Sequence, residues 1–437
     1  MLRKLIVSFS RLGPRAFPFL PGWQSEQTTS AAAAWKRVPL HVKVLVVHNR
    51  YQHAGGEDVV VEQECHMLRN AGHEVITYLR SNDEIKSFSR LQRLALIPRT
   101  VWATDTRREF KALLERERPG IVHVHNTFVM ISPSIFSACE EAGIPVVHTL
   151  HNYRLMCPTG LFYRDGHVCE ECVQMSLWSG IRHGCYHDSG AATAVVAGMI
   201  AVHRRLHTWS QPSHFYIALS QFARQKFVDS GLPEERIFVK PNFVHPDPGL
   251  PSDRERYAVF AGRLSAEKRV DNLLRAWERS NSHFPLLILG DGPERPGLEE
   301  AARHRNLSGI DFKGRVPRAQ VIEIVRKARF LVFPSELYEN FPVAIVEAFA
   351  CGTSVVCSRM GAMQEIVSDG STGLLFAPGQ VDDLAEKMDW AWAHPDQMNK
   401  MGRRARREYE TKYTAETNYR LLMDIYNQVK KRSTTRV

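Results

Sequence analysis

The chain has 437 residues, of which 44% are hydrophobic and 24% are charged, as is usual for a globular protein of about two or three domains. None of its apolar runs approaches the roughly 20 residues of a membrane-spanning helix. The net charge of +10 favours an anionic partner, and part of the excess lies in the basic residues between Arg403 and Arg432. An anionic membrane surface and simple solubility both explain this excess. No nucleic-acid-binding module is visible, so no nucleic acid is expected as a partner.

Residues 1–40 differ from the rest of the chain. They hold six basic residues and a single acid, Glu26. The apolar stretch Leu5–Val7 is too short for the core of a signal peptide. A transit peptide, a disordered extension and a non-native start are the alternatives, and we leave this segment out of the fold.

Strand-like and helix-like segments alternate through residues 41–240. Short apolar runs predict strands at Val42–Val47, His73–Leu79, Ile121–His125, Pro145–Leu150, Phe215–Ser220 and Arg236–Lys240. Helical patterns lie between them, at Glu57–Asn70, 83–118, Ser132–Ala142, Ala191–Thr208 and Gln221–Asp229. The alternation predicts a doubly wound parallel sheet, whose ligand lies beyond the carboxyl ends of the strands.

The same architecture repeats after a proline-rich linker at 245–253. Strands are predicted at Tyr257–Ala261, Pro285–Leu289, Ile310–Phe312, Arg329–Pro334, Ser354–Cys357 and Leu374–Phe376. The predicted helices are Val270–Ser280, Glu294–Arg305, Arg318–Ala328, one that has Pro342 in its first turn and stops at Gly352, Ala362–Val367 and Val381–Ala393, followed by 396–413 and 415–431. We therefore predict an α/β protein with two Rossmann-like domains.

Two groups of residues in the first half follow predicted strands. Gly55 and Gly56 lie between a strand end and a helix start, where glycine lets the backbone approach an anion or a sugar. A tight turn explains the pair equally well. His125 and the segment His151–Tyr153 also follow strands, and for them ligand contact and a structural role stay open.

A long insertion at 151–190 contains four cysteines, spaced Cys157-x11-Cys169-x2-Cys172-x12-Cys185. Their number and the central Cys-x2-Cys pair match a structural zinc site with four thiolates. An iron–sulfur cluster uses the same ligands, and reduced thiols or a disulfide are the alternatives without metal. The other four cysteines lie in apolar periodic segments and are expected in the core: Cys65, Cys139, Cys351 and Cys357.

The stretch from Phe330 to Gly352 is predicted as strand, loop and helix, with Pro342 in the first helical turn. Glu347 lies inside a helix that is apolar on all sides, so its carboxylate is buried. A buried carboxylate needs polar partners, which either the fold or a ligand supplies. A second glutamate, Glu339, lies in the loop before this helix.

Three loops of the second half follow strands and should converge at one edge of the sheet. They carry Arg263 with Lys268, then Gly290 with Asp291, then Glu339. Two cations and a helix N-terminus together form a site for a diphosphate without a metal. For either cation alone, an ion pair with a neighbouring acid is the simpler explanation.

The chain resembles the retaining glycosyltransferases of the GT-B fold with an E-x7-E motif, family GT4, through FAGRLSAEKRVDNLL, GDGPE, FKGRVP, ENFPVAIVEAFACG and GAMQEIVSDGSTGLLFAPG. The first half resembles a subgroup linked to exopolysaccharide or lipopolysaccharide assembly, through HNRYQHAGGEDVVVEQE, IVHVHNTF and HTLHNYRLMCPTGLFYRDGHVCEECV. The resemblance covers residues 42–430.

The resemblance implies roles for single residues. Arg263 and Lys268 would neutralise the diphosphate of a nucleotide-sugar, Glu339 would bind the donor sugar, and Glu347 would bind the ribose. His125 would hydrogen-bond the sugar or orient the acceptor. The implied catalytic residues are Arg263, Lys268, Glu339 and His125. The implied donor-binding set is Gly55, Gly56, Gly262, Gly290, Asp291, Arg315, Val316, Asn340, Phe341, Pro342, Val343 and Glu347. The implied acceptor side is His151, Asn152 and Tyr153.

The resemblance also implies an acceptor-binding domain at 41–240 and a nucleotide-sugar-binding domain at 241–414, facing each other across a cleft. The last helix, 415–437, would return to the first domain. The implied reaction moves a hexose-type sugar with retention, without a catalytic metal, to a glycan or lipid-linked acceptor in cell-surface polysaccharide synthesis. The implied location is the cytoplasm or the inner face of the plasma membrane. A catalytically inactive scaffold of a polysaccharide assembly complex is the alternative.

Overall fold

The structure is a computed structural model that describes residues 41–52 and 55–434. These residues belong to one compact unit. The segment 1–40, which the sequence sets apart, lies outside the described residues. None of the helices in the described ranges combines the length and the apolar character that crossing a membrane requires.

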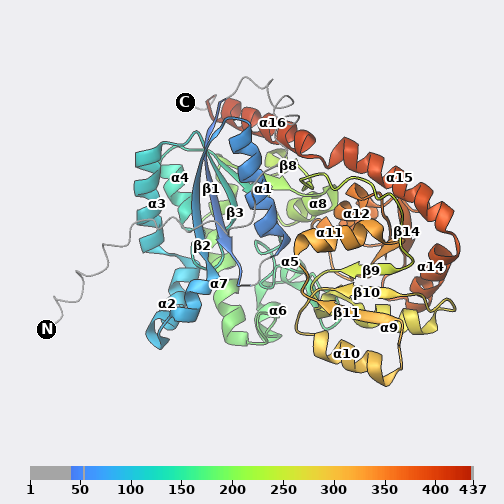
Figure 1. The fold of residues 1–437 in the computed structure, drawn as a ribbon. Coiled ribbons are helices and arrows are strands. Elements are labelled where there is room, and N and C mark those ends of the chain that lie inside the picture. The colour runs from blue at the N-terminus through green and yellow to red at the C-terminus, as the bar shows by residue number, and fades with distance from the viewer. Residues whose placement is uncertain (1–40, 53–54, 435–437) are drawn as a thin grey trace. The chain divides into compact units, whose positions relative to one another are not determined.

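The first half is built on a parallel sheet of six strands in the order β2-β1-β3-β4-β7-β8 (Figure 1). The strands are β1 (Lys43–Arg50), β2 (Glu74–Ser81), β3 (Ile121–Asn126), β4 (Val146–Thr149), β7 (His214–Ala218) and β8 (Ile237–Val239). The longer helices around it are α1 (Gly56–Asn70), α2 (Arg90–Val101), α3 (Thr104–Glu117), α4 (Ile135–Glu141), α7 (Gly190–Arg205) and α8 (Gln221–Asp229). The strand order reverses direction between β1 and β3, so this is the point where a ligand is expected.

The second half repeats this topology in the order β11-β10-β9-β12-β13-β14. The strands are β9 (Ala258–Ala261), β10 (Leu286–Leu289), β11 (Ile310–Gly314), β12 (Phe330–Phe333), β13 (Ser354–Ser358) and β14 (Gly373–Phe376). The helices are α9 (Val270–Arg279), α10 (Arg295–His304), α11 (Arg318–Lys327), α12 (Val343–Ala350), α13 (Ala362–Ile366), α14 (Val381–Ala393) and α15 (Pro395–Lys412). In this sheet the order reverses between β9 and β12. The prediction of two doubly wound parallel sheets is confirmed.

Two predicted segments differ in detail from the structure. The helical region expected at 83–118 is a 3-10 helix at Asn82–Ser87 followed by α2 and α3. It is divided because Ser89 accepts a hydrogen bond from the backbone of Gln92 and so caps a new helix. The insertion at 151–190 holds a hairpin of β5 (Tyr163–Arg164) and β6 (His167–Val168). Two short helices follow it, α5 (Glu171–Gln174) and α6 (Leu177–Arg182).

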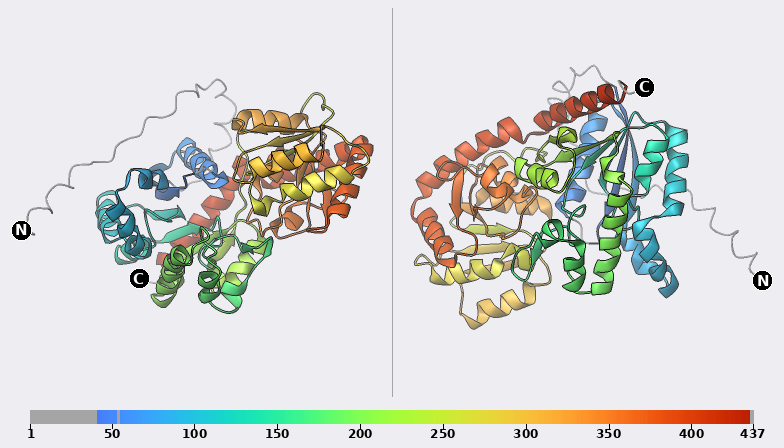
Figure 2. Two further views of the ribbon diagram at one scale, coloured as in Figure 1. Left: turned by 90° about the horizontal axis from the view of Figure 1, so that it is seen from below. Right: turned by 180° about the vertical axis from the view of Figure 1, so that it is seen from behind.

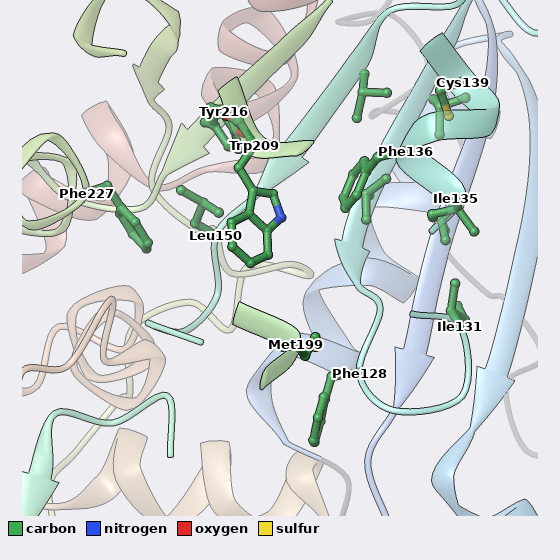
Figure 3. Close-up of a cluster of buried hydrophobic side chains, with 14 of the residues drawn as sticks. Phe128, Ile131, Ile135, Phe136, Cys139, Leu150, Met199, Trp209, Tyr216 and Phe227 are labelled. Atoms are coloured by element: carbon green, nitrogen blue, oxygen red, sulfur yellow. The ribbon is translucent and has the colours of Figure 1, made fainter. Parts of the chain in front are cut away.

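Large apolar side chains fill the space between the first sheet and its helices. Figure 3 shows Phe128, Phe136, Met199 and Trp209 within this cluster, and all four are buried. Met199 comes from α7, so one face of that helix packs in the core. The four cysteines expected in the core are also buried: Cys65, Cys139, Cys351 and Cys357.

The last helix, α16 (Ala415–Thr434), contacts the first half although it follows the second half in the chain (Figure 1, Figure 2). The hydroxyl of Tyr426 lies 2.8 Å from Nδ1 of His123, and that of Tyr419 lies 2.8 Å from Nε2 of His73. These contacts support the implied return of the C-terminal helix. The boundaries at 240 and 414 stay a prediction.

Candidate active site

The loops after β9 and β10 pack directly against each other at the reversal point of the second sheet. The amide of Leu264 donates to the carbonyl of Asp291 at 3.0 Å. Gly290 has a φ of +140°, and a Cβ there would lie 1.8 Å from the carbonyl oxygen of Gly262. Only glycine fits such an approach, so the GDG sequence is required for the two loops to meet.

The loop after β12 joins them. The amide of Glu336 donates to the carbonyl of Glu267 at 3.0 Å. The Lys268 ammonium forms an ion pair with the Glu339 carboxylate, which also accepts a hydrogen bond from Ser335 at 2.7 Å. Lys268 is only 16% exposed. The three loops therefore converge as predicted, and Glu339, expected to face a sugar, holds Lys268 in this structure.

Arg263 forms the ion pair with its neighbour that the sequence suggested as the simpler explanation. Its Nη2 lies 2.8 Å from Oε1 of Glu267, and its side chain is 54% exposed. Burial acts to raise the pKa of Glu267, but the hydrogen bond from Ser265 and the charge of Arg263 outweigh it and lower that pKa. Arg263 is therefore the more accessible of the two cations.

The helix α12 begins one residue later than predicted, because Pro342 is its N-cap rather than a residue of its first turn. Glu347 meets a partner that the sequence reasoning missed. Nε and Nη2 of Arg318 donate to Oε1 of Glu347 at 3.0 and 2.8 Å. Burial raises the pKa of Glu347, and the charge of Arg318 opposes this shift. The fold thus supplies one partner and uses one carboxylate oxygen.

The remaining donor-side residues lie around the start of α12. Asn340 is buried and its Oδ1 meets no hydrogen-bond donor among the described residues, while its carbonyl accepts from Ser220 at 3.1 Å. Phe341 packs edge-to-face against Tyr413 at 5.8 Å between ring centroids. Arg315 is exposed, whereas the neighbouring Val316 packs against the core of the second half.

The double glycine of the first half approaches this same helix. A Cβ on Gly56 would lie 3.8 Å from Cγ2 of Val343, the first residue of α12. The amide of Gly55 donates to Oδ2 of Asp58 at 2.8 Å, and the other carboxylate oxygen of Asp58 lies 2.8 Å from Nε2 of His48. The start of α1 therefore faces the start of α12, with glycine backbone between them.

His125 lies in a buried polar cluster at the end of β3. Its Nδ1 lies 2.9 Å from Nε2 of His151, and its Nε2 lies 3.4 Å from Oε1 of Glu64. Burial, reinforced by His123, lowers the pKa of His125 to about 3. Burial and His125 also lower the pKa of His151 well below its usual range. Both imidazoles are therefore neutral at physiological pH.

The same cluster contains three residues that could hold a metal ion. The ligand atoms of Glu64, His123 and His125 lie within 4.8 Å of one another. Lys240, only 1% exposed, places its ammonium 3.0 Å from Oε2 of Glu64. Burial acts to raise the pKa of Glu64, but Lys240 and His123 outweigh it and hold that pKa well below its usual range. The lysine already supplies the positive charge that the buried carboxylate needs, so we assign no metal to this cluster.

A second polar group, missed by the sequence reasoning, lies beside the double glycine. Glu57 accepts from Nδ2 of Asn126 at 3.3 Å, and burial with the nearby Asp58 raises its pKa to about 8. The guanidinium of Arg154 lies 4.4 Å from the ring centroid of Phe128. An acid directly after Gly-Gly and an arginine directly after the HNY segment were the available sequence signals.

The predicted acceptor-side residues divide into two kinds. Nδ2 of Asn152 donates to the hydroxyl of Tyr51 at 3.3 Å, so Asn152 belongs to the polar group around Glu57. Tyr153 is 1% exposed and packs against Phe162, with ring centroids 4.8 Å apart. Burial raises the pKa of Tyr153. Its ring therefore belongs to the core.

The four cysteines of the insertion line one small cavity, together with Tyr163, Arg164 and Gly180. The structure thus brings the sequence-predicted quartet together around one cavity. It separates the quartet from the histidine cluster at the strand ends.

Comparison with known proteins identifies both halves. The model for glycosyl transferases group 1 matches residues 245–408, and the model for glycosyltransferase family 4 matches residues 54–248. The chain is 33% identical over 375 residues to a D-inositol 3-phosphate glycosyltransferase of Kribbella flavida, covering 80% of this chain and 86% of that protein. It is 30% identical over 162 residues to the D-rhamnosyltransferase WbpZ of Pseudomonas aeruginosa. That match covers 37% of this chain and 42% of the relative, so it spans less than half of the relative's length.

Among solved structures, the crystal structure of Anabaena HepE in complex with UDP and glucose superposes with a TM-score of 0.65 at 17% identity. The superposition covers 89% of this chain and 100% of that one. It confirms the GT-B fold that the two doubly wound sheets indicate.

Proposed function

This chain belongs to the group 1 glycosyltransferases of family 4, which use nucleotide-sugar donors, and on that premise we propose that it transfers a hexose-type sugar with retention of the anomeric configuration. The acceptor is a glycan or a lipid-linked sugar of cell-surface polysaccharide synthesis. No catalytic metal takes part.

One observation carries this proposal: Lys268 and Glu339 form a nearly buried ion pair at the reversal point of the second sheet. Arg263 lies on the same loop with half of its side chain exposed. A diphosphate entering this site meets two cations and the N-terminus of α12, whose unpaired amides favour an anion. Binding of the diphosphate would draw Lys268 away from Glu339 and free the carboxylate for hydroxyls of the donor sugar.

The middle of the same helix fits the nucleoside, because it carries Glu347. Glu347 uses Oε1 for Arg318, and Oε2 has no hydrogen bond to any described side chain or backbone group in this structure. A carboxylate held in this way can accept two hydrogen bonds from a ribose diol. Arg315 and Val316 lie just before Arg318 in the chain and are the residues we assign to the nucleobase.

The reaction follows from this arrangement. The acceptor hydroxyl attacks the anomeric carbon on the face that the diphosphate leaves, so one C–O bond forms while the bond to the phosphate oxygen breaks. The acceptor proton passes to an oxygen of the departing diphosphate. Lys268 and Arg263 stabilise the charge that develops there, and the protein contributes positioning rather than a nucleophile.

The acceptor side is assigned to the first half, at the ends of β1 and β3. His125 and His151 are neutral, so each imidazole has one hydrogen-bond donor and one acceptor and carries no charge. Glu57, whose pKa is raised to about 8, is mostly protonated at pH 7 and can donate a hydrogen bond to a sugar oxygen.

A product analysis tests this function. Purified protein is incubated with a panel of nucleotide-sugars and extracted lipid-linked glycans, and the new anomeric signal is read by NMR. We expect α-linked product from an α-linked donor, a loss of about 100-fold or more in Lys268→Ala, and unchanged transfer in the matched surface variant Lys327→Ala. Inverted product refutes retention. Donor binding without transfer to any acceptor favours the inactive scaffold.

The proposed lipid-linked acceptor needs a surface that faces a membrane, and the first half has an apolar one. Seven of the nine exposed large apolar side chains among the described residues lie on or beside α2, α6 and α7: Leu91, Leu94, Ile97, Met175, Trp178, Val202 and Leu206. Leu91 and Trp178 are 79% and 67% exposed. α7 contacts both α2 and α6, and the three helices lie at one end of the first half (Figure 1).

The positive charge of this surface favours binding to an anionic bilayer. α2, α6 and α7 contain no acidic residue and carry six arginines: Arg90, Arg93, Arg99, Arg182, Arg204 and Arg205. Apolar side chains flanked by arginine are typical of helices that lie in the interface of anionic lipid. Two basic residues of the C-terminal region have partners within the protein: Arg406 pairs with Asp247 at 2.6 Å, and Arg432 donates to the carbonyl of Glu235 at 2.6 Å.

Vesicle co-sedimentation tests this surface. We expect the protein to bind vesicles that contain phosphatidylglycerol and not vesicles of phosphatidylcholine alone. Leu91→Ser combined with Leu94→Ser should abolish binding, whereas Leu250→Ser, at a leucine that is 53% exposed in the second half, should leave it unchanged. Equal loss in both variants, or no binding to anionic vesicles, contradicts the assignment.

A further inference from the structure

The cysteine quartet is the one motif of the sequence that the proposed transfer reaction does not use. Cys169 directly follows the hairpin strand β6, and its amide donates to the carbonyl of Phe162 at 2.8 Å. Cys172 lies in α5, so the Cys-x2-Cys pair turns around the end of the hairpin. Cys157 and Cys185 approach from the two ends of the insertion. All four are free thiols.

The four cysteines line a cavity of about 10 Å³, close to the space that one water-sized sphere needs. Gly180 lines it, and a Cβ on this residue would lie 3.1 Å from Sγ of Cys172. The sulfur of Cys157 lies 3.1 Å from the hydroxyl of Thr159. Within the described residues only Glu64, His123 and His125 have three ligand atoms within 4.8 Å of one another, so the four sulfurs must turn inward to enclose an ion.

We propose that Cys157, Cys169, Cys172 and Cys185 bind one Zn²⁺ as four thiolates, and that this ion holds the hairpin against the loop of Lys268. Four cysteines that line one small cavity supply the ligand set of the tetrahedral structural sites of zinc, with Zn–S bonds of about 2.3 Å. Binding releases the thiol protons and leaves a net charge of −2 on the ion with its ligands. Arg164 lines the cavity and offsets part of this charge, and Glu171 orients it through hydrogen bonds of 3.1 and 2.8 Å.

The base of the insertion is anchored in the core by Tyr153 and Phe162, but its regular elements are short. Its hairpin strands have two residues each, and its two helices have four and six. Segments as short as these do not hold their conformation on their own, and metal ligation supplies folding energy directly in such lobes.

The hairpin contacts the candidate donor site at two points. The hydroxyl of Tyr163, in β5, donates to the carbonyl of Ala266 at 3.3 Å, two residues before Lys268. Glu170, between the paired cysteines, forms a salt bridge of 2.6 Å with Lys226, whose ammonium lies 4.9 Å from the ring centroid of Tyr338. Tyr338 directly precedes Glu339. Both members of the Lys268–Glu339 pair are thus next to residues that the metal-held lobe touches.

Elemental analysis of the purified full-length protein tests the metal. We expect about one zinc per chain, loss of that zinc in Cys169→Ser, and full zinc content in Cys65→Ala, which removes a thiol outside the quartet. If Cys169→Ser does not fold, the wild-type protein still decides: exchange of its metal for Co²⁺ should give the visible absorption of a tetrahedral thiolate site. Stoichiometric iron, or no metal in the wild-type protein, overturns the proposal.

Nucleotide binding tests the second part, which rests on the proposed function. Calorimetric titration of wild-type protein with nucleoside diphosphates is compared before and after zinc removal by a chelator. We expect weaker binding after removal, by the factor of roughly 5 to 150 that couples two sites in proteins. Tyr163→Phe should weaken binding while keeping its zinc. If neither zinc removal nor Tyr163→Phe changes the affinity, the coupling between the zinc site and nucleotide binding is refuted and the metal site is not. Absence of any nucleotide binding to the zinc-loaded protein refutes the proposed function and leaves the metal site standing.

Discussion

Arg318 donates two hydrogen bonds to a single oxygen of Glu347, at 3.0 and 2.8 Å. The pair links α11 to α12, and the charge of Arg318 opposes part of the rise in the pKa of Glu347 that burial causes. It leaves Oε2 for a ligand. This geometry separates the proposed ribose contact from the proposed phosphate contact, and each can be tested without the other.

For the ribose contact, Glu347→Gln should weaken the binding of nucleoside diphosphates and leave the binding of inorganic pyrophosphate unchanged. Loss of hydrogen bonds to a charged group costs about 1.5–3 kcal/mol, which is a factor of roughly 10 to 150 in affinity. Glu323→Gln, on the surface of α11, is the control. Equal weakening for both ligands would remove Glu347 from the ribose site. The measurement is calorimetric titration.

For the phosphate contact, Lys268→Ala and Arg263→Ala should both lower transfer, Lys268→Ala more strongly. Lys268 is 16% exposed and Arg263 is 54% exposed, so solvent screens the arginine more. We expect a loss of roughly 100-fold or more at Lys268, as for removal of one charge-stabilising donor. The kcat values of the two variants test this order. A larger loss of kcat in Arg263→Ala than in Lys268→Ala would contradict the prediction.

The buried pair of Lys240 and Glu64 should be essential for stability. Lys240→Met leaves the Glu64 carboxylate buried without its cation, which costs about 3–5 kcal/mol of the free energy of unfolding. Adding Glu64→Gln to this variant should restore part of the loss, because the amide carries no charge. Urea unfolding of the single and double variants measures both effects. A double variant less stable than Lys240→Met would show that the two side chains do not act as a pair.

Glu57 should make stability depend on pH. Its pKa is raised from 4.5 to about 8, so the native state keeps a proton that the unfolded chain releases. The contribution of Glu57 to the free energy of unfolding therefore falls as the pH rises from about 4.5 to about 8, and is constant above that. In Glu57→Gln this decline is absent, so its stability relative to wild type should increase across the window. A pH-independent difference in urea unfolding would refute the shift.

The elements of both sheets could be predicted from the sequence because their signals are local. Alternating apolar runs and helical patterns placed β1 and β12 correctly, and the three donor loops follow from parallel topology alone. Partners distant in the chain could not be predicted. Arg318 reaches Glu347, and Lys240 reaches Glu64 across 176 positions. Glu64 lies among apolar residues of α1 just as Glu347 does in α12, and that signal was present in the sequence.

The exposure of the apolar side chains on α2 and α6 could not be predicted, for a different reason. Periodicity shows that a helix such as α2 has an apolar face, but not whether a neighbour covers it. The sequence therefore pointed to the basic C-terminal region as a surface for lipid, and that prediction stays untested; the structure adds Leu91 and Leu94 as exposed apolar side chains.

The most direct test of the donor site is thermal unfolding of the full-length protein with a panel of nucleoside diphosphates and nucleotide-sugars. A ligand present at about 100 times its Kd stabilises the native state by about 2.7 kcal/mol, enough to raise the Tm measurably. We predict such a rise with one nucleobase, and none in Lys268→Ala. No rise with any nucleotide, or a rise that persists in Lys268→Ala, would contradict the assignment of this site.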